Sequence, residues 1–185
     1  MPGLVPPIAD ERTALLAFLA QQRDALRYAA FGLSDAEADS RPSVSQLSLA
    51  GLIKHVTGVE RAWTTFLLEG DTTVFAVSDD HEDRFRLASG ETLSDVLEAS
   101  AEQARLTEKI VAEMDLGGAL PATTDVVPWI PAGLRWTPRW VLLHLMEEMA
   151  RHAGHADIVR ESIDGKTCWT LMAAAEGWSM EDWAS

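Results

Sequence analysis

Four long segments of the chain repeat apolar residues at intervals of three and four, and no segment shows the alternation expected of a half-buried strand. Each segment opens on a residue that commonly caps helix N-termini, and the last has proline at its first helical position. We therefore predict four long helices: from about Asp10 to Ala30, from Ser48 to Glu69, from Thr92 to about Met114, and from Thr137 to about Gly165. The pattern "SDAE" (residues 34–37) predicts one further short turn. The expected fold is an all-α four-helix bundle.

The connections between these predicted helices are uneven. Residues 71–91 are mostly acidic and polar, and residues 116–136 are rich in proline, glycine and tryptophan. Both loops are long for a helical bundle, and long ordered loops are often functional. The tail after the fourth helix carries Trp169, Trp178 and Trp183, so we expect it to dock on the bundle. Because there are no internal repeats, we interpret all 185 residues as one domain.

The charge of the chain disfavours some classes of partner. Lys and Arg number 15, and Asp and Glu number 29, which gives a net charge of −14. This negative field opposes binding to nucleic acid and to anionic membrane surfaces. Cys168 is the only cysteine, so no intrachain disulfide can form. We expect neither a signal peptide nor a membrane span, and therefore a soluble, cytoplasmic protein.

The fourth predicted helix carries three histidines and two glutamates in the stretch "HLMEEMARHAGHAD" (residues 144–157). With about 100° between successive residues, the three histidines fall within about 40° of Glu148. They are His144, His152 and His155. Apolar residues of the same helix fall on this side too, namely Val141, Leu145 and Val159. We therefore expect Glu148 and the histidines to face the core, where unpaired polar groups cost several kcal/mol.

The second predicted helix supplies a partner for these residues, because His55 lies within its apolar stripe. The spacing Glu148-x-x-x-His152 places two side chains on one face, one turn apart, so that both can reach one metal ion. His55 from a facing helix would complete a set of two imidazoles and one carboxylate. Such a set suits Zn, Ni, Mn or Fe(II). The alternative is a buried network of hydrogen-bonded His and Glu side chains without a metal.

The remaining histidines have supporting roles in this interpretation. His155 follows His152 by three residues, which is a poorer chelating arrangement, so we expect it beside the ligands or lining the pocket. His144, one turn before Glu148, would orient that carboxylate. His81 lies in the acidic loop, and we interpret it as a solvated surface residue.

Aromatic and basic residues are expected near the same site. Trp63 and Trp140 are interpreted as core packing. The alternative is an aromatic pocket mouth shared with Trp129 and Trp136. Arg139, with nearby Arg135, could bind an anionic co-substrate, although solvated surface arginines are commoner.

The chain resembles the DinB/YfiT-like superfamily in three stretches: "GLSDAEADSRPS" (residues 32–43), "LSLAGLIKHVTGVERAW" (residues 47–63) and "EEMARHAGHADIVRESIDG" (residues 147–165). The similarity covers nearly the whole chain and is greater to the actinobacterial branch that includes mycothiol-dependent enzymes. It implies an up-down-down-up four-helix bundle, often dimeric, in which a histidine triad binds a metal between helices.

The resemblance also assigns ligands by position. The first ligand is His55. The second motif is His-x-x-x-His in many members, and here Glu148 takes its first position and His152 its second. This departure resembles the His/Glu/His pattern of mycothiol-dependent maleylpyruvate isomerase. Zinc is the expected metal, although the carboxylate leaves the metal preference open.

The implied function is that of a metal-dependent enzyme of S-transferase or isomerase type. Its co-substrates would be a low-molecular-weight, mycothiol-like thiol and a small electrophile. A metal-coordinated thiol loses its proton and is a nucleophile at neutral pH, so no protein nucleophile is required. Cys168 lies outside the helical stripe and is therefore interpreted as structural. The second hypothesis is a non-catalytic, metal-binding or stress-associated dimer of the same fold. A homodimer is expected in either case.

Overall fold

The computed structural model describes residues 3–75, 85–120 and 136–179, and within these ranges every regular element is a helix. Four are long: α1 (Glu11–Ala29), α3 (Leu49–Glu69), α4 (Leu93–Ala112) and α5 (Pro138–Asp164). Three are short: α2 (Asp35–Ala38), the 3-10 helix η1 (Thr72–Phe75) and α6 (Cys168–Glu176). The predicted all-α class is confirmed. None of the described helices combines the length and the apolar run needed to cross a bilayer.

Side-chain caps set the ends of the long helices. Asp10, Ser48, Thr92 and Thr137 each accept a hydrogen bond from the backbone N–H three residues further on. α3 and α5 each end at a glycine in the left-handed conformation, with φ of 66° and 75°. Because capping residues can be recognised in the sequence, the predicted ends lie within one or two residues of the observed ones.

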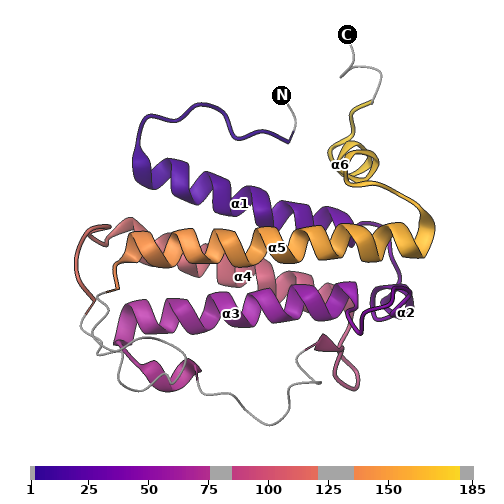
Figure 1. Cartoon of the computed structure of the whole chain (residues 1–185), viewed down its shortest axis with the longest axis horizontal. Helices are drawn as coiled ribbons and strands as arrows, with labels where there is room; N and C mark the ends of the chain where they lie inside the picture. Colours follow the sequence, from indigo (N-terminus) through magenta and orange to yellow (C-terminus); the bar gives the residue numbers. More distant parts are fainter. Residues whose placement is uncertain (1–2, 76–84, 121–135, 180–185) are drawn as a thin grey trace.

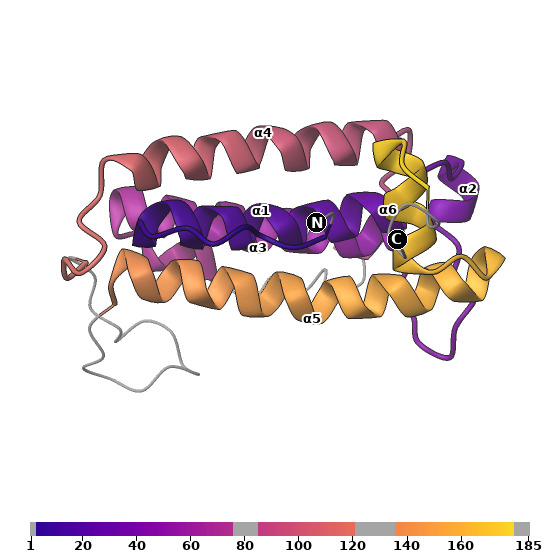
Figure 2. The ribbon, with the colours of Figure 1, turned by 90° about the horizontal axis from the view of Figure 1, so that it is seen from above.

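The long helices lie side by side, with α1 and α5 running one way along the molecule and α3 and α4 the other (Figure 1). This order agrees with the up-down-down-up bundle that the family resemblance implies. Seen from above, α4 and α5 flank the pair formed by α1 and α3 (Figure 2). α5 packs against both α1 and α3, so different parts of its buried face meet different neighbours. The core between the helices is apolar and includes Leu19, Leu52, Phe66, Val111 and Leu145.

The C-terminal tail docks on the bundle, as expected, but it does so as a helix that sequence analysis did not predict. Leu171 and Met172 of α6 form a small apolar cluster with Tyr28 of α1, and Trp178 packs against it. The Tyr28 hydroxyl also donates a hydrogen bond to Glu176. α6 has only nine residues, too few for an apolar period to distinguish a helix from a loop.

A buried polar network crosses the core between α1, α3 and α4. Glu60 is 1% exposed and accepts hydrogen bonds from Arg23 and Thr107. Gln103 donates to Thr64, whose hydroxyl lies 3.1 Å from that of Thr107. Within the described part of the chain, no buried side-chain nitrogen or oxygen is left without a hydrogen-bond partner. Arg23 extends the network to the half-exposed Glu108 at 3.1 Å, so its buried members are all bonded and one end reaches the surface.

Candidate metal centre

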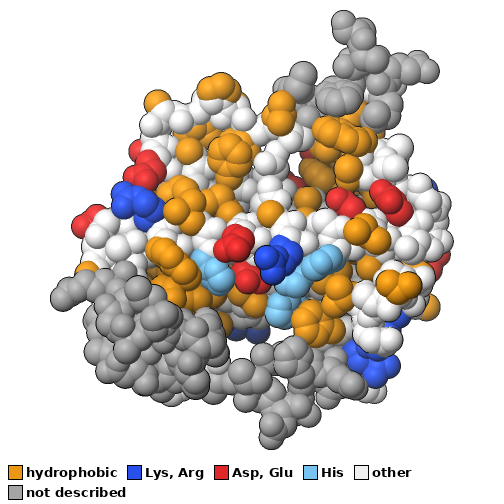
Figure 3. Space-filling model, viewed as in Figure 1, with side chains coloured by type: hydrophobic (Ala, Val, Ile, Leu, Met, Phe, Trp, Pro, Cys, Tyr) orange, Lys and Arg blue, Asp and Glu red, His pale blue; other side chains and the backbone are white. Residues whose placement is uncertain are grey.

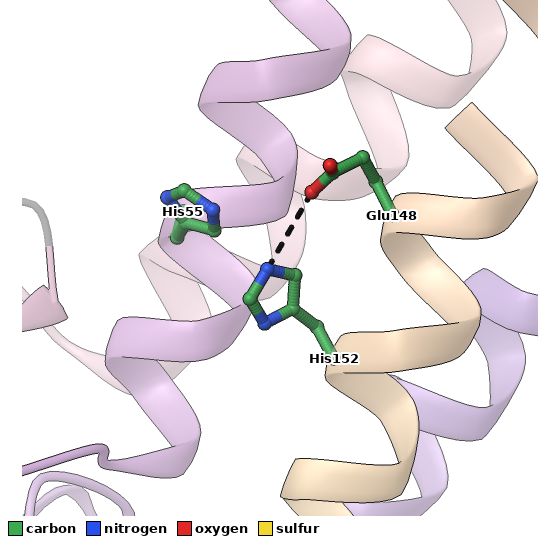
Figure 4. A group of neighbouring side chains, drawn as sticks. All are labelled: His55, Glu148 and His152. Carbon is green, nitrogen blue, oxygen red and sulfur yellow. Dashed lines mark ion pairs between the residues drawn. The ribbon is translucent and has the colours of Figure 1, made fainter. Parts of the chain in front are cut away.

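His55 of α3 meets Glu148 and His152 of α5 where the two helices pack together (Figure 4). One ligand atom from each side chain lies within 4.8 Å of the other two. The Nε2 atom of His152 is 3.6 Å from an Oε atom of Glu148, and the His55 and His152 rings meet edge-on with centroids 4.8 Å apart. The structure thus brings together the three residues that the sequence motifs single out.

The donor set comes close to the geometry that a shared metal ion requires. Two donors that bind one ion at about 2.0–2.1 Å lie at most about 4.2 Å apart. The 3.6 Å separation of His152 and Glu148 is already inside this limit, and the 4.8 Å span of the whole group exceeds it by a distance that small side-chain rotations can close. Among the described residues, no other group of three His, Cys, Asp or Glu side chains comes this close.

The site is half-buried, which corrects the expectation that these residues face the core. The side chains of His152, His144 and Glu148 are 14%, 21% and 30% exposed. Histidine side chains accordingly reach the surface along α5 (Figure 3). The buried stripe of α5 runs through Leu145, Met149 and Ala156, which lie about 60–100° round the helix from Glu148. The site therefore lies on the flank of the buried stripe and is open to solvent on one side.

The surroundings of His152 favour the neutral form of its imidazole. Burial lowers the pKa of His152, and the nearby Glu148 carboxylate only partly opposes this effect. A neutral ring offers a lone pair to a metal ion without first losing a proton.

His155 lies near the ring nitrogen of His152 that faces away from Glu148. The Nδ1 atoms of the two rings lie 3.5 Å apart, while the Nε2 atom of His152 is the one near Glu148. If Nε2 binds a metal, Nδ1 of His152 carries the proton and can donate it to Nδ1 of His155. The structure thus places His155 beside His152, the residue that the sequence analysis assigns as a ligand.

His144 lies close to Glu148 without bonding to it. Its Nε2 atom is 4.0 Å from a Glu148 oxygen, which is too long for a hydrogen bond. The ring instead stacks on Trp140, with centroids 5.0 Å apart and planes at 19°, and meets Trp63 edge-on. The expected role in orienting Glu148 is therefore not seen as a direct contact.

The tryptophans divide between core and surface. Trp63 is 3% exposed and Trp136 is 6% exposed, in agreement with core packing for Trp63. Trp140 is 42% exposed, so its interpretation as a core residue was wrong. Its ring packs at the edge of the core, against Trp63 and Trp136 with centroids 5.4 and 4.2 Å away, and covers the His144 ring.

Arg139 is held by an ion pair. Its guanidinium donates to both carboxylate oxygens of Glu11, at 2.6 and 3.0 Å, and so joins α5 to α1. The guanidinium that the sequence suggested for an anionic co-substrate is thus already paired with a carboxylate. Four other residues considered from the sequence, His81, Trp129, Arg135 and Trp183, lie outside the described residues.

Sequence analysis missed the feature that positions His55. The Phe85 ring stacks on the His55 ring, with centroids 4.5 Å apart and planes at 24°. The backbone of Phe85 reaches this position because residue 51 is glycine, where a Cβ atom would lie 2.0 Å from the Phe85 carbonyl oxygen. Ser48 donates to the same carbonyl at 3.3 Å. The available signal was a glycine one turn before His55 on the buried face of a helix.

Cys168 lies in α6, away from these ligands. Burial, and then the nearby Asp157 carboxylate, raise the pKa of the Cys168 thiol. The thiol is therefore a weak nucleophile at neutral pH, which supports its interpretation as a structural residue.

The comparisons with known proteins concern the family and the fold of the chain. The model of the Mycothiol-S-transferase family matches residues 14–165. The chain belongs to this family. A solved structure described as the crystal structure of the conserved protein of locus from Enterococcus faecalis is 15% identical, with a TM-score of 0.61 over 86% of this chain and 100% of that one. At this identity the likeness shows a shared fold alone, and no curated protein matches the chain.

Proposed function

We propose that the protein is a metal-dependent enzyme that transfers a low-molecular-weight, mycothiol-like thiol to a small electrophile. His55, Glu148 and His152 would bind a divalent metal, with zinc as the expected ion. The observation that carries the proposal is the approach of their three ligand atoms to within 4.8 Å, in a chain that belongs to the Mycothiol-S-transferase family.

The chemistry follows from the donor set. When bound, the metal would lower the pKa of a coordinated thiol so far that the sulfur is a thiolate at neutral pH. Two neutral imidazoles and one carboxylate offset only part of a divalent charge, and they leave positions open for a co-substrate. Because the side chains are partly exposed, a thiol can reach this point from solvent.

The chain's own residues would position these groups. Phe85 holds the His55 ring by stacking, and His155 holds the His152 ring through its Nδ1 atom. Trp140 and His144 form a stacked wall on the side of the site nearer the start of α5. An apolar or aromatic portion of the electrophile would lie against such a wall.

The test combines metal analysis with a transfer assay. Purified protein that has met no chelator should contain about one transition-metal ion per chain, as a three-ligand site predicts. It should then couple mycothiol to a fluorogenic electrophile faster than glutathione or free cysteine. Protein that binds the metal but transfers no thiol to any electrophile would support the second hypothesis, a metal-binding protein without activity. Protein that neither contains nor takes up a metal would refute both.

We also propose a homodimer in the cytoplasm. The dimer rests on the family resemblance, and the exposed apolar residues Leu143 and Ile158 of α5 offer surface for it. Light scattering at micromolar concentration should give twice the 20.2 kDa mass of the chain. The location follows from the single cysteine and from the need for a reduced thiol as co-substrate.

A further inference from the structure

A pocket of about 660 Å³ lies on the side of α5 opposite the candidate metal centre. It is bounded by the N-terminal residues 3–6, by α1 and by α6, and Figure 3 shows the hollow beside α6. Asp157 of α5 reaches this pocket because it follows Glu148 by nine residues, about two and a half turns, and so points the opposite way. The pocket is separate from the site of the proposed function.

The walls of the pocket are held in place by specific contacts. Gln21 of α1 donates a hydrogen bond to the carbonyl of Gly3, which fixes the N-terminal segment. Gly3 has a φ of 78°, and a Cβ atom there would lie 3.0 Å from the terminal carbon of Met172. The lining is largely apolar and includes Leu4, Val5, Pro6, Ala17, Ala20 and Met172. A pocket with this volume and a mostly apolar lining is typical of small-molecule binding sites.

The charges of the lining favour a cation. Three carboxylates line the pocket, and none of its lining residues is basic. Asp24 is already paired with Arg27 at 3.0 Å. Glu176 already accepts hydrogen bonds from Tyr28 and from Trp178.

Asp157 is the carboxylate that remains for a ligand. Among the described residues it has neither a hydrogen bond nor an ion pair, although it is half-buried. Burial, and then the nearby Glu161, raise the pKa of Asp157, so the charged form of this carboxylate is destabilised. A cation that donates hydrogen bonds to it would offset this destabilisation.

We propose that this pocket binds a small organic ammonium ion, whose N–H groups donate to Asp157 and whose apolar body lies against α1 and Met172. A metal ion fits less well, because the pocket carboxylates do not belong to the group of three or more potential ligands that the described residues form. An anion would meet three carboxylates, and a neutral apolar molecule would desolvate Asp157 without compensating it.

The single cysteine of the chain makes the proposal directly testable. Cys168 lines this pocket, so a bound ligand should slow its alkylation by iodoacetamide. Three probes share one ring and differ in charge: benzylammonium, benzyl alcohol and benzoate. Benzylammonium should protect Cys168 at a concentration about tenfold lower than benzyl alcohol, as expected for one charge-assisted hydrogen bond, and benzoate should not protect it.

Matched variants separate the charge from the shape of the pocket. Asp157→Asn should abolish the preference for benzylammonium over benzyl alcohol. Asp24→Asn removes the same charge from a carboxylate that is already paired, and it should keep most of the preference. Ala20→Trp should narrow the pocket and weaken protection by every probe, with circular dichroism confirming that the helices are intact. Equal protection by all three probes, no protection by any, or a preference that survives in Asp157→Asn would overturn the proposal.

The metal content of the same variants keeps this inference distinct from the proposed function. Asp157→Asn should hold as much metal as the wild type, because Asp157 and Glu148 lie on opposite sides of α5. Loss of probe binding with full metal content would show that the pocket and the metal centre are independent.

Discussion

The candidate metal centre and the Glu60 network each combine one glutamate with polar side chains from neighbouring helices, but they differ in how these groups are arranged. Glu60 is 1% exposed, and its partners bond to it and to one another. At the metal centre, Glu148 is 30% exposed and lies 3.6 Å from His152, too far for a good hydrogen bond. Polar side chains that hydrogen-bond to one another stabilise the bundle, whereas donor atoms that converge without bonding leave space for an ion.

The largest expected effect comes from removing a ligand. His55→Ala or His152→Ala should reduce the metal content from about one ion per chain to nearly none, because two protein donors rarely hold a metal. Thiol-transfer activity should disappear with it. Elemental analysis and the transfer assay measure the two effects on the same samples.

The fold of these variants should survive, because apolar residues such as Leu52, Leu145 and Met149 supply most of the burial. Circular dichroism and thermal melting provide the control. Wild-type metal content in His55→Ala would end the assignment of His55 as a ligand, and the metal centre would then be a second structural network.

The next effect should come from opening the Glu60 network. Glu60→Ala removes the buried partner of Arg23, which keeps only the half-exposed Glu108, and should cost about 3 kcal/mol of unfolding free energy. Metal content should not change. Urea unfolding measures the cost, with Glu69→Ala at the exposed end of the same helix as the matched control. If Glu60→Ala loses metal under conditions where it is still folded, the Glu60 network and the metal site are coupled.

A smaller effect is expected beside the ligands. His155→Ala should weaken metal binding by about 10- to 100-fold, the usual effect of removing the partner of a metal-binding histidine, while the metal still binds at saturation. His155→Asn, whose amide oxygen can accept from Nδ1 of His152, should recover much of the affinity. Competition with a chelator of known affinity measures both variants. Equal affinities for wild type, His155→Ala and His155→Asn would leave His155 without a positioning role.

The smallest effect concerns a polar contact far from both regions. Asp164 accepts two hydrogen bonds from the fully buried Arg160, and these bonds hold the pKa of Asp164 well below its usual range. Because the folded-state pKa is lowered, this contribution is present above the unfolded pKa of about 3.9 and is lost as the pH falls through the folded value. Asp164→Asn should therefore cost about 1 kcal/mol at pH 7 and progressively less below pH ~4. Urea unfolding of the wild type and of Asp164→Asn at pH 7 and below pH ~4 tests this prediction. A difference in unfolding free energy that does not change with pH would contradict it.

The long helices could be predicted from the sequence because their signals are local. Asp10, Ser48, Thr92 and Thr137 are capping residues at the points where the apolar period begins. The helix α6 could not be predicted, because its order comes from contacts of Leu171 and Met172 with Tyr28, which is far away in the sequence.

The site residues were predicted better than their surroundings. The i, i+4 spacing of Glu148 and His152 is local, so the pair could be found without a structure. Their burial was overestimated, because Val141 and Val159 mark the edge of the buried stripe of α5, while Met149 lies nearer its centre. A helical wheel gives the angle between residues but not the direction of the neighbouring helices, which depends on the packing of the whole bundle.

The close approach of Phe85 to Gly51 means that the sequence requirements of this site extend beyond its donor atoms. Any larger residue at position 51 must displace the backbone that carries the Phe85 ring, and the His55 imidazole would then lose the surface that limits its rotation. In a saturation library selected for metal uptake, we expect position 51 to tolerate almost as few substitutions as position 55, although glycine can bind nothing through a side chain.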